Sequence, residues 1–260
     1  MTSRGVFPFG EPVRDVSQTD RTPKKVFVLG VYASAIHARW VGADGKTTVN
    51  ALAVASEPYI FWRGENPEVS IQRIQVPPAL GKLMPASSQY NGPSGIALDE
   101  LILKPLGIAR ADAWLCDLVP RSCVNPSQIK AIERAYLPVA EKHRLPKPSV
   151  SPVPAVLADA ARREAIWNEL QESGARTLIL LGDKPIQWFL AHFDSRWRRL
   201  ADFTHNGKPY GTPHEICLNG RPINVLPLAH PRQIARLGQS SADWHERHRL
   251  WVRNGARSVL

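Results

Sequence analysis

The sequence predicts an α/β domain of three layers, αβα, with a central four-stranded parallel sheet and a small antiparallel decoration at one edge. Short apolar runs of strand length recur along the chain, helical patterns separate most of them, and Asp-Gly and Asn-Gly pairs interrupt the order in two places. The chain has 260 residues, of which 43% are hydrophobic, enough to bury a sizeable core.

Four apolar runs lack the alternation of half-exposed strands, so we expect strands buried on both faces, as in a parallel sheet. The runs are Val26–Leu29, Ala113–Cys116, Thr177–Leu181 and Ile223–Leu226. We interpret residues 1–24 as an N-terminal extension and residues 25–260 as the domain.

Helices are expected between and after these strands. Asn125-Pro126 is a good cap and first-turn pair for a helix over about 126–143. A second helix is expected from near Pro154 to a left-handed cap at Gly174. Further helices are expected over Ser94–Leu106, from Asp183, and from a capping box that begins at Ser240.

Three pairs are typical of hairpin turns: Asp44-Gly45, Asn206-Gly207 and Asn219-Gly220. They predict antiparallel strands at the sheet edge. The stretch 65–93, rich in Pro, Ser and Gln, is expected to be a long surface loop.

The composition favours an anionic partner. Lys and Arg number 33 against 23 Asp and Glu, a net charge of +10, which makes nucleic acid the obvious candidate; the alternative is a protein that is simply basic. Cys116, Cys123 and Cys217 fit neither a disulfide framework nor a zinc site. We therefore expect a cytoplasmic protein without a bound metal. No stretch approaches eighteen apolar residues, so we expect no membrane span, and we expect no cofactor.

Ligands of an open parallel sheet bind outside the carboxyl ends of its strands. The segments that follow the four runs are Gly30–Ala35, Asp117–Arg121, Gly182-Asp183 and Ala229–Arg232. Dinucleotide-binding, P-loop and α/β-hydrolase motifs are missing from the sequence, which argues against those chemistries.

Several of these segments resemble motifs of the uracil-DNA glycosylase superfamily. Gly30–Ser34 (GVYAS) is similar to its first motif, Asn91–Asp99 to the Gly-Arg-Ser-Gly-x-x-Leu-Asp stretch of its thermophile-type bacterial members, and Leu226–Pro231 to the strand and His-Pro-Ser motif that close the fold. The motifs occur in the family's order over most of the chain.

The resemblance implies a DNA-base glycosylase that flips uracil or another deaminated base out of single- or double-stranded DNA and hydrolyses its N-glycosidic bond. It implies no metal, and three cysteines are too few for the iron-sulfur cluster of some members. The implied catalytic residues are His230, Asp117 and Tyr32. Those implied for the base are Gly30, Val31, Ala33, Val54 and Tyr59, and those for DNA are Ser34, Pro231, Arg232 and Arg236.

Three positions depart from the family pattern. Tyr32, a neutral phenol, stands where an Asp, Glu or Asn is usual, and Ala33 replaces the following proline. Asp117 stands where the family has an Asn. An ionised Asp only accepts hydrogen bonds, which would favour a base edge that presents donors. Alternatively, Asp117 supplies the missing catalytic charge. The structural alternatives are that Asp117 caps a loop or pairs with Arg121, and that His230 is a packed strand-end histidine.

Three functions are therefore weighed. The first is an atypical glycosylase; the second is a catalytically silent protein that keeps the fold and binds nucleic acid or senses lesions, which Tyr32 and Ala33 favour. The third is a fold relative that binds a small nucleotide. Salt dependence of binding separates the second from the third.

Overall fold

The computed structural model describes residues 5–207, 209–237 and 241–259, and the chain forms two compact units. Unit 1 consists of Met1–Val16, Tyr32–Pro93 and Pro120–Ala155, and unit 2 of Ser17–Val31, Ser94–Val119 and Val156–Leu260. Within the described residues, no helix combines the length and apolar character needed to span a bilayer.

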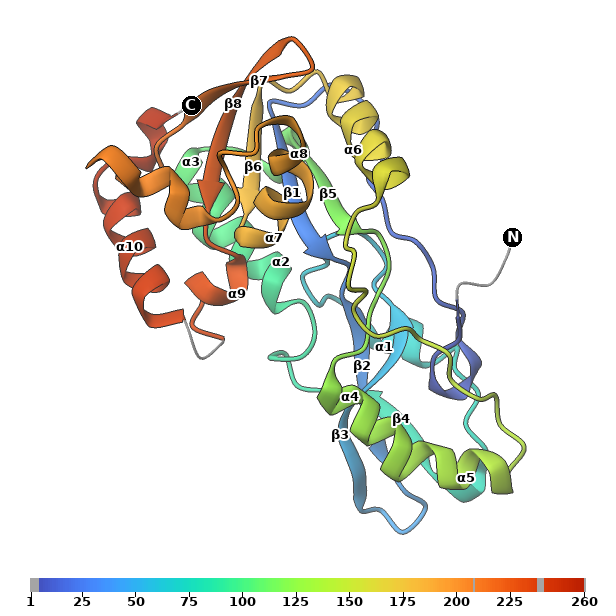
Figure 1. Ribbon diagram of the computed structural model, residues 1–260. Helices are drawn as coiled ribbons and strands as arrows, with labels where there is room; N and C mark the ends of the chain where they lie inside the picture. The colour runs from blue at the N-terminus through green and yellow to red at the C-terminus, as the bar shows by residue number, and fades with distance from the viewer. Residues whose placement is uncertain (1–4, 208, 238–240, 260) are drawn as a thin grey trace. The chain divides into compact units, whose positions relative to one another are not determined.

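Unit 2 contains a five-stranded, mostly parallel sheet in the order β5-β1-β6-β8-β7 (Figure 1). Strand β6 pairs in parallel with β1 on one side and with β8 on the other, and β7 is antiparallel to β8. All four apolar runs of the sequence lie in these strands. The strands are β1 (Val26–Tyr32), β5 (Ala113–Val119), β6 (Thr177–Leu181), β7 (His214–Leu218) and β8 (Arg221–Leu228).

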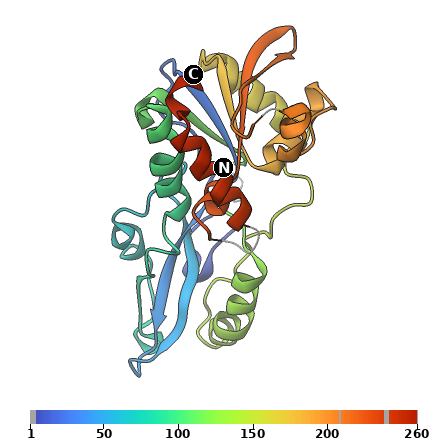
Figure 2. The same cartoon turned by 90° about the vertical axis from the view of Figure 1, so that its left-hand side faces the viewer.

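Helices cover both faces of this sheet, with α6 and α8 on one side and α2, α3 and α10 on the other (Figures 1 and 2). The α6 face is fixed by contacts with β5: the Trp114 indole N–H donates to Glu169 at 3.1 Å. The helices of unit 2 are α2 (Pro93–Leu98), η3 (Asp99–Leu103), α3 (Lys104–Leu106), η4 (Arg110–Asp112), α6 (Ala160–Glu172), α7 (Asp183–Pro185), η6 (Ile186–Leu190), α8 (Ala191–Phe193), η7 (Leu200–Gly207), α9 (Pro231–Ile234), α10 (Ser241–Arg253) and η8 (Ala256–Val259).

The edge hairpin of this sheet is confirmed. Asn219 and Gly220 both have positive φ, 49° and 80°, the conformation that a two-residue turn between β7 and β8 needs. The prediction of a hairpin turn at Asn206-Gly207 is wrong, because these residues are the last two of the 3₁₀-helix η7 and do not follow a strand directly. Ser240, the expected cap of the last helix, lies outside the described residues.

Unit 1 is built on a separate antiparallel sheet in the order β3-β2-β4. Its core contains Phe9, Trp40 and Tyr136, whose rings meet edge to face, and the Trp40 indole donates to the Leu80 carbonyl at 2.7 Å. Its elements are η1 (Pro8–Gly10), β2 (Ala35–Val41), β3 (Thr47–Ser56), α1 (Pro67–Ile71), η2 (Pro78–Leu80), β4 (Lys82–Pro85), α4 (Pro126–Ala131), η5 (Ile132–Tyr136) and α5 (Leu137–Lys142).

Two expectations for unit 1 need correction. The Asp44-Gly45 turn joins β2 to β3 in this second sheet, so that hairpin does not decorate the parallel sheet. The stretch 65–93 is not a structureless loop, since it contains α1, η2 and β4, and β4 pairs with β2. Buried Ile71 and Leu80 anchor it in the core.

Candidate functional site

His230 begins helix α9 just after strand β8. Its Nδ1 accepts a hydrogen bond from the backbone N–H of Arg232 at 3.2 Å, and its own N–H donates to Oε1 of Gln233 at 3.2 Å. Because Nδ1 is the acceptor, the proton of the neutral ring lies on Nε2. Burial, with a smaller effect of the Arg232 charge, lowers the pKa of His230 to about 4. The ring is therefore a neutral donor at pH 7, and in the described part of the chain Nε2 has no hydrogen-bond partner.

Gly182 closes the turn after β6 against His230. Its φ is 85°, its N–H donates to the Leu228 carbonyl at 2.7 Å, and an added Cβ would lie 3.3 Å from the His230 Cβ. Only glycine adopts this backbone conformation readily and leaves that space. The turn after β6 thus helps to fix the position of His230.

A buried hydrogen-bond network braces the residue before His230. The Ala229 N–H donates to the Tyr210 hydroxyl at 2.9 Å, which lies 2.9 Å from Nδ1 of His248, and Nε2 of His248 lies 2.6 Å from the Leu101 carbonyl. The carbonyl can only accept, so Nε2 of His248 donates to it, and Tyr210 donates to Nδ1. Helix α10 is in this way tied to the carboxyl end of β8.

Asp117 lies inside β5, two residues before its end, and is 4% exposed. Burial, opposed by the charge of Arg162, raises the pKa of its carboxyl to about 7. Arg162 donates to the backbone carbonyls of Asp117 and Leu118, at 2.6 and 3.1 Å. The carboxyl is therefore divided between its acid and its anion near pH 7, and the acid form both donates and accepts, as an Asn amide does. The ionised, accept-only Asp117 expected from the sequence is one of the two forms present near pH 7, and its role stays a prediction.

The strand order places a topological switch point between β1 and β6. From β1 the chain goes on to β5 on one side, and from β6 to β8 on the other. Ligands of open α/β sheets bind where such a reversal occurs. Gly30 is buried and Val31 partly buried near the end of β1, while Tyr32, its last residue, is 40% exposed. Gly30 thus lies within the strand and not after it, because β1 is longer than its apolar run.

The residues implied for DNA contact in unit 2 lie on and after α9. Pro231 is buried and packs the first turn of the helix. Arg232 and Arg236 are exposed, and neither forms an ion pair with a described residue. Arg236 has a φ of 58° and ends the turn after α9. Two cationic side chains are therefore available to anions beside His230.

The other implied residues belong to unit 1. Ala33 is buried, and the Ser34 carbonyl accepts from the Ser122 hydroxyl. Val54 is fully buried in the core, and the Tyr59 hydroxyl contacts Glu65. The stacking role of Val54 and Tyr59 stays a prediction.

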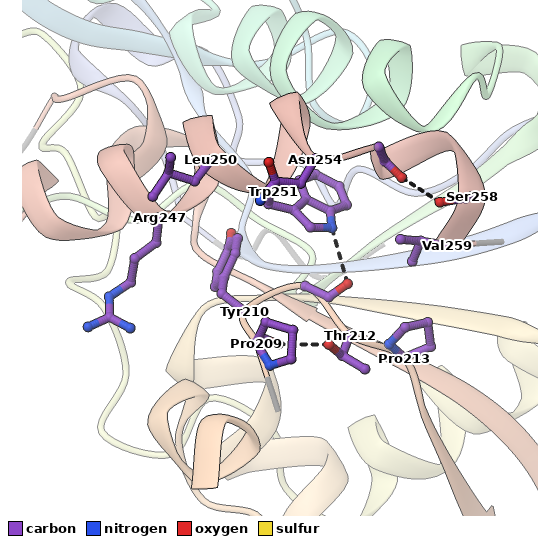
Figure 3. Close-up of a pocket in the computed structure, with 12 residues that line it drawn as sticks. Pro209, Tyr210, Thr212, Pro213, Arg247, Leu250, Trp251, Asn254, Ser258 and Val259 are labelled. Carbon is purple, nitrogen blue, oxygen red and sulfur yellow. Dashed lines mark hydrogen bonds between the residues drawn. The ribbon is translucent and has the colours of Figure 1, made fainter. Parts of the chain in front are cut away.

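A pocket of about 740 Å³ lies in unit 2 between residues 209–213 and the C-terminal helices (Figure 3). Trp251 forms its inner wall, donating to the Gly211 carbonyl at 3.1 Å, and Arg247 and Leu250 lie at its rim. It includes none of the residues implied by the sequence. Tyr210 lines it and also accepts from the Ala229 N–H, so the pocket and the network beside His230 share this residue.

The sequence does not single out three residues that support the site, Tyr210, His248 and Arg162. His248 is visible in the sequence only as part of an aromatic stripe at helical spacing, which is more often core, and its ring is indeed buried. Arg162 gives no local signal, because it reaches Asp117 across 45 positions of sequence.

No group of three His, Cys, Asp or Glu side chains within residues 5–207, 209–237 and 241–259 could hold a metal ion. Cys116, Cys123 and Cys217 are free thiols. Neither a scan against protein-family models nor a search of curated proteins found a match to this chain.

Proposed function

We propose that the chain binds an extruded nucleobase at the carboxyl ends of β5, β1, β6 and β8, and that it is an atypical DNA-base glycosylase of the uracil-DNA glycosylase superfamily. The observation that carries the proposal is the state of His230. The ring is neutral, its Nδ1 is used by the helix cap, and its Nε2–H is left to donate. A donor of this kind stabilises the negative charge that a departing base acquires.

Asp117 supports the same interpretation from the far side of the switch point. Its strand is separated from β8 by β1 and β6, which at strand spacing is roughly 14 Å between the axes of β5 and β8. Asp117 and His230 would then contact different edges of one ligand. As an acid, Asp117 offers the donor and acceptor pair of the family's Asn; as an anion, it offers charge.

The alternative function is a silent lesion-binding protein, which the exposed phenol of Tyr32 favours. Tyr32 offers no carboxylate to stabilise positive charge on the sugar. A phenol has an ordinary pKa of about 10, so it is neutral near pH 7. In that case the base would be bound and not released.

The test is an excision assay on single- and double-stranded oligonucleotides with uracil, hypoxanthine or xanthine, followed by alkaline cleavage. The matched variant is His230→Asn, because the Asn side chain still caps α9 but has no Nε2 donor. Loss of strand cleavage in His230→Asn supports excision; no wild-type cleavage above the His230→Ala background on any substrate refutes it.

The role of Asp117 needs two further variants. Asp117→Asn should keep base binding, whereas Asp117→Ala should lose excision if the carboxyl supplies charge or reads the base. Tyr32→Phe should have a smaller effect. An unchanged rate in Asp117→Ala would remove Asp117 from the site.

A further inference from the structure

A second pocket of unit 2, of about 360 Å³, lies between helix α6 and the segment that runs from η6 through α8. We call it the α6–α8 pocket; none of its residues belongs to the site around His230. Among the described residues, no acidic side chain lines it. The lining residues are Arg163, Gln187, Trp188, Ala191, His192 and Arg198.

The guanidinium groups of the two pocket arginines form no hydrogen bond or ion pair with a carboxylate of a described residue. Arg163 donates from Nη1 to the Ala158 carbonyl at 2.8 Å, and its buried Nε has no partner. The Arg198 side chain has only a long contact, 3.5 Å, from Nε to the Ser195 carbonyl, while its backbone N–H donates to Asp202 Oδ2 at 2.8 Å. A buried guanidinium N–H without a partner is costly, and a ligand oxygen would relieve it.

The neighbouring arginines behave differently. Arg162 pairs with Glu169, Arg196 with Asp194 and Arg199 with Asp202, at 3.4, 2.7 and 3.1 Å. Acidic partners are therefore present on the same elements, yet within the described part of the chain the guanidinium groups of Arg163 and Arg198 pair with none of them. This selective lack of neutralisation indicates an anion site and not a generally basic surface.

Trp188 adds a planar apolar surface to the pocket. Its indole is partly exposed and meets no other ring in the described residues, whereas Trp167 and Phe189 of the same layer both pack against Phe193, at 5.7 and 5.2 Å. An aromatic face beside cationic groups is how proteins hold a base and its phosphate. Pockets of this size accept small ligands.

We propose that the α6–α8 pocket binds a nucleoside phosphate, with the phosphate between Arg163 and Arg198 and the base against Trp188. Arginine suits this task because its planar fork donates two hydrogen bonds to phosphate oxygens. The phosphate belongs either to a free mononucleotide or to a nucleic-acid strand. The chemistry is the same in both cases.

The experiment is calorimetric titration of the full chain with adenosine 5′-monophosphate, adenosine and inorganic phosphate, and fluorescence anisotropy with an undamaged single-stranded oligonucleotide. The variants are Arg163→Gln, Arg198→Gln and Trp188→Leu, with Arg196→Gln as control. The control removes the same charge from the same loop, but from an arginine that is already paired. Circular dichroism checks that each variant is folded.

We expect Arg198→Gln and Arg163→Gln to raise Kd by about 10- to 100-fold, the loss of a charge-assisted hydrogen bond, and Arg196→Gln to change it by less than about twofold. Adenosine should bind far more weakly than its phosphate. A raised Kd for the mononucleotide in the arginine variants assigns the pocket to free nucleotides. A raised Kd for the oligonucleotide alone assigns it to a nucleic-acid strand.

The proposal is overturned if Arg198→Gln leaves the Kd of both the mononucleotide and the oligonucleotide unchanged. It is also overturned if Arg196→Gln raises the Kd equally, which would mean general charge attraction only. Arg198 is exposed, so Arg198→Gln is expected to fold and its Kd tests the proposal even if Arg163→Gln fails to fold. Because the ligands carry no damaged base, this outcome is independent of excision and of His230→Asn.

Discussion

The buried carboxyl of Asp117 links stability to pH. Its pKa is about 7 in the fold against an ordinary value of 3.8, so the folded state binds a proton more tightly than the unfolded chain. The corresponding stability is fully present below pH 3.8 and is lost as pH rises through 7. Arg162 lowers this pKa, but burial has the larger effect.

We therefore expect Asp117→Asn, which cannot ionise, to gain stability over the wild type as pH rises. Between pH 5 and pH 8 the difference in unfolding free energy should grow by about 2–3 kcal/mol in favour of the variant. Urea unfolding at both pH values measures it. A difference that is equal at pH 5 and pH 8 would show that Asp117 is not buried as described.

Tyr210 connects two partners through one hydroxyl, so its removal should be costly. Tyr210→Phe leaves the Ala229 N–H without its acceptor and Nδ1 of His248 without its donor. We expect a loss of about 1–3 kcal/mol in unfolding free energy. Tyr90→Phe, at a 41% exposed ring, is the control and should cost less than about 0.5 kcal/mol. Equal losses would argue against the network.

The elements differ in how far they can be predicted. The four apolar runs are predictable as strands because a strand buried on both faces must be apolar throughout, whereas the five-stranded mixed sheet that they join is not the four-stranded sheet that the sequence predicts. For α6 the pattern predicts a start near Pro154, six residues early, although Asp159 carries the signal: its side chain accepts from the Arg162 N–H at 2.8 Å and caps the helix. Strand β4 is not predictable, since it has four residues, two of them exposed, and β2 supplies its pairing.

Substitutions at Gly220 and Gly211 should lower the free energy of unfolding for different reasons, backbone conformation alone at Gly220 and close packing in addition at Gly211. Gly220 has a φ of 80° and an added Cβ would meet no atom within 4 Å, whereas Gly211 has a φ of 75° and its Cβ would lie 2.4 Å from the Trp251 Nε1. Gly220→Ala should cost about 1–2 kcal/mol, the effect of left-handed backbone alone. Gly211→Ala should cost about 1–3 kcal/mol more, because the buried Trp251 ring, which donates to the Gly211 carbonyl, must shift. Urea unfolding of the two variants tests this; equal costs would contradict the close approach of α10 to residue 211.

At the scale of the whole molecule, turn chemistry indicates where a hairpin turns but not which sheet it joins. Asp44-Gly45 and Asn219-Gly220 give the same local signal, yet one hairpin builds the sheet of unit 1 and the other the edge of the parallel sheet. Long-range pairing decides this, and no local pattern records it. The same holds for the candidate site: periodicity predicts where the strands lie, whereas Arg162 and Tyr210 contact residues far away in the sequence.

If the chain binds DNA as proposed, its net charge of +10 should make the affinity depend on salt. The affinity should fall steeply with salt, because each neutralised phosphate releases counterions. Arg232 and Arg236 are exposed and unpaired among the described residues, so each is expected to take one phosphate.

Arg232→Gln and Arg236→Gln should each reduce the slope of log Kobs against log salt by about 1. Arg249→Gln is the control, because Arg249 is already paired with Glu246 at 2.6 Å, and its slope should match that of the wild type. Anisotropy titrations between about 50 and 200 mM salt measure all three slopes. Equal slopes in all three variants would place the DNA away from α9, whereas a loss confined to Arg232 and Arg236 would place it beside the free Nε2–H of His230, where an extruded base needs a donor.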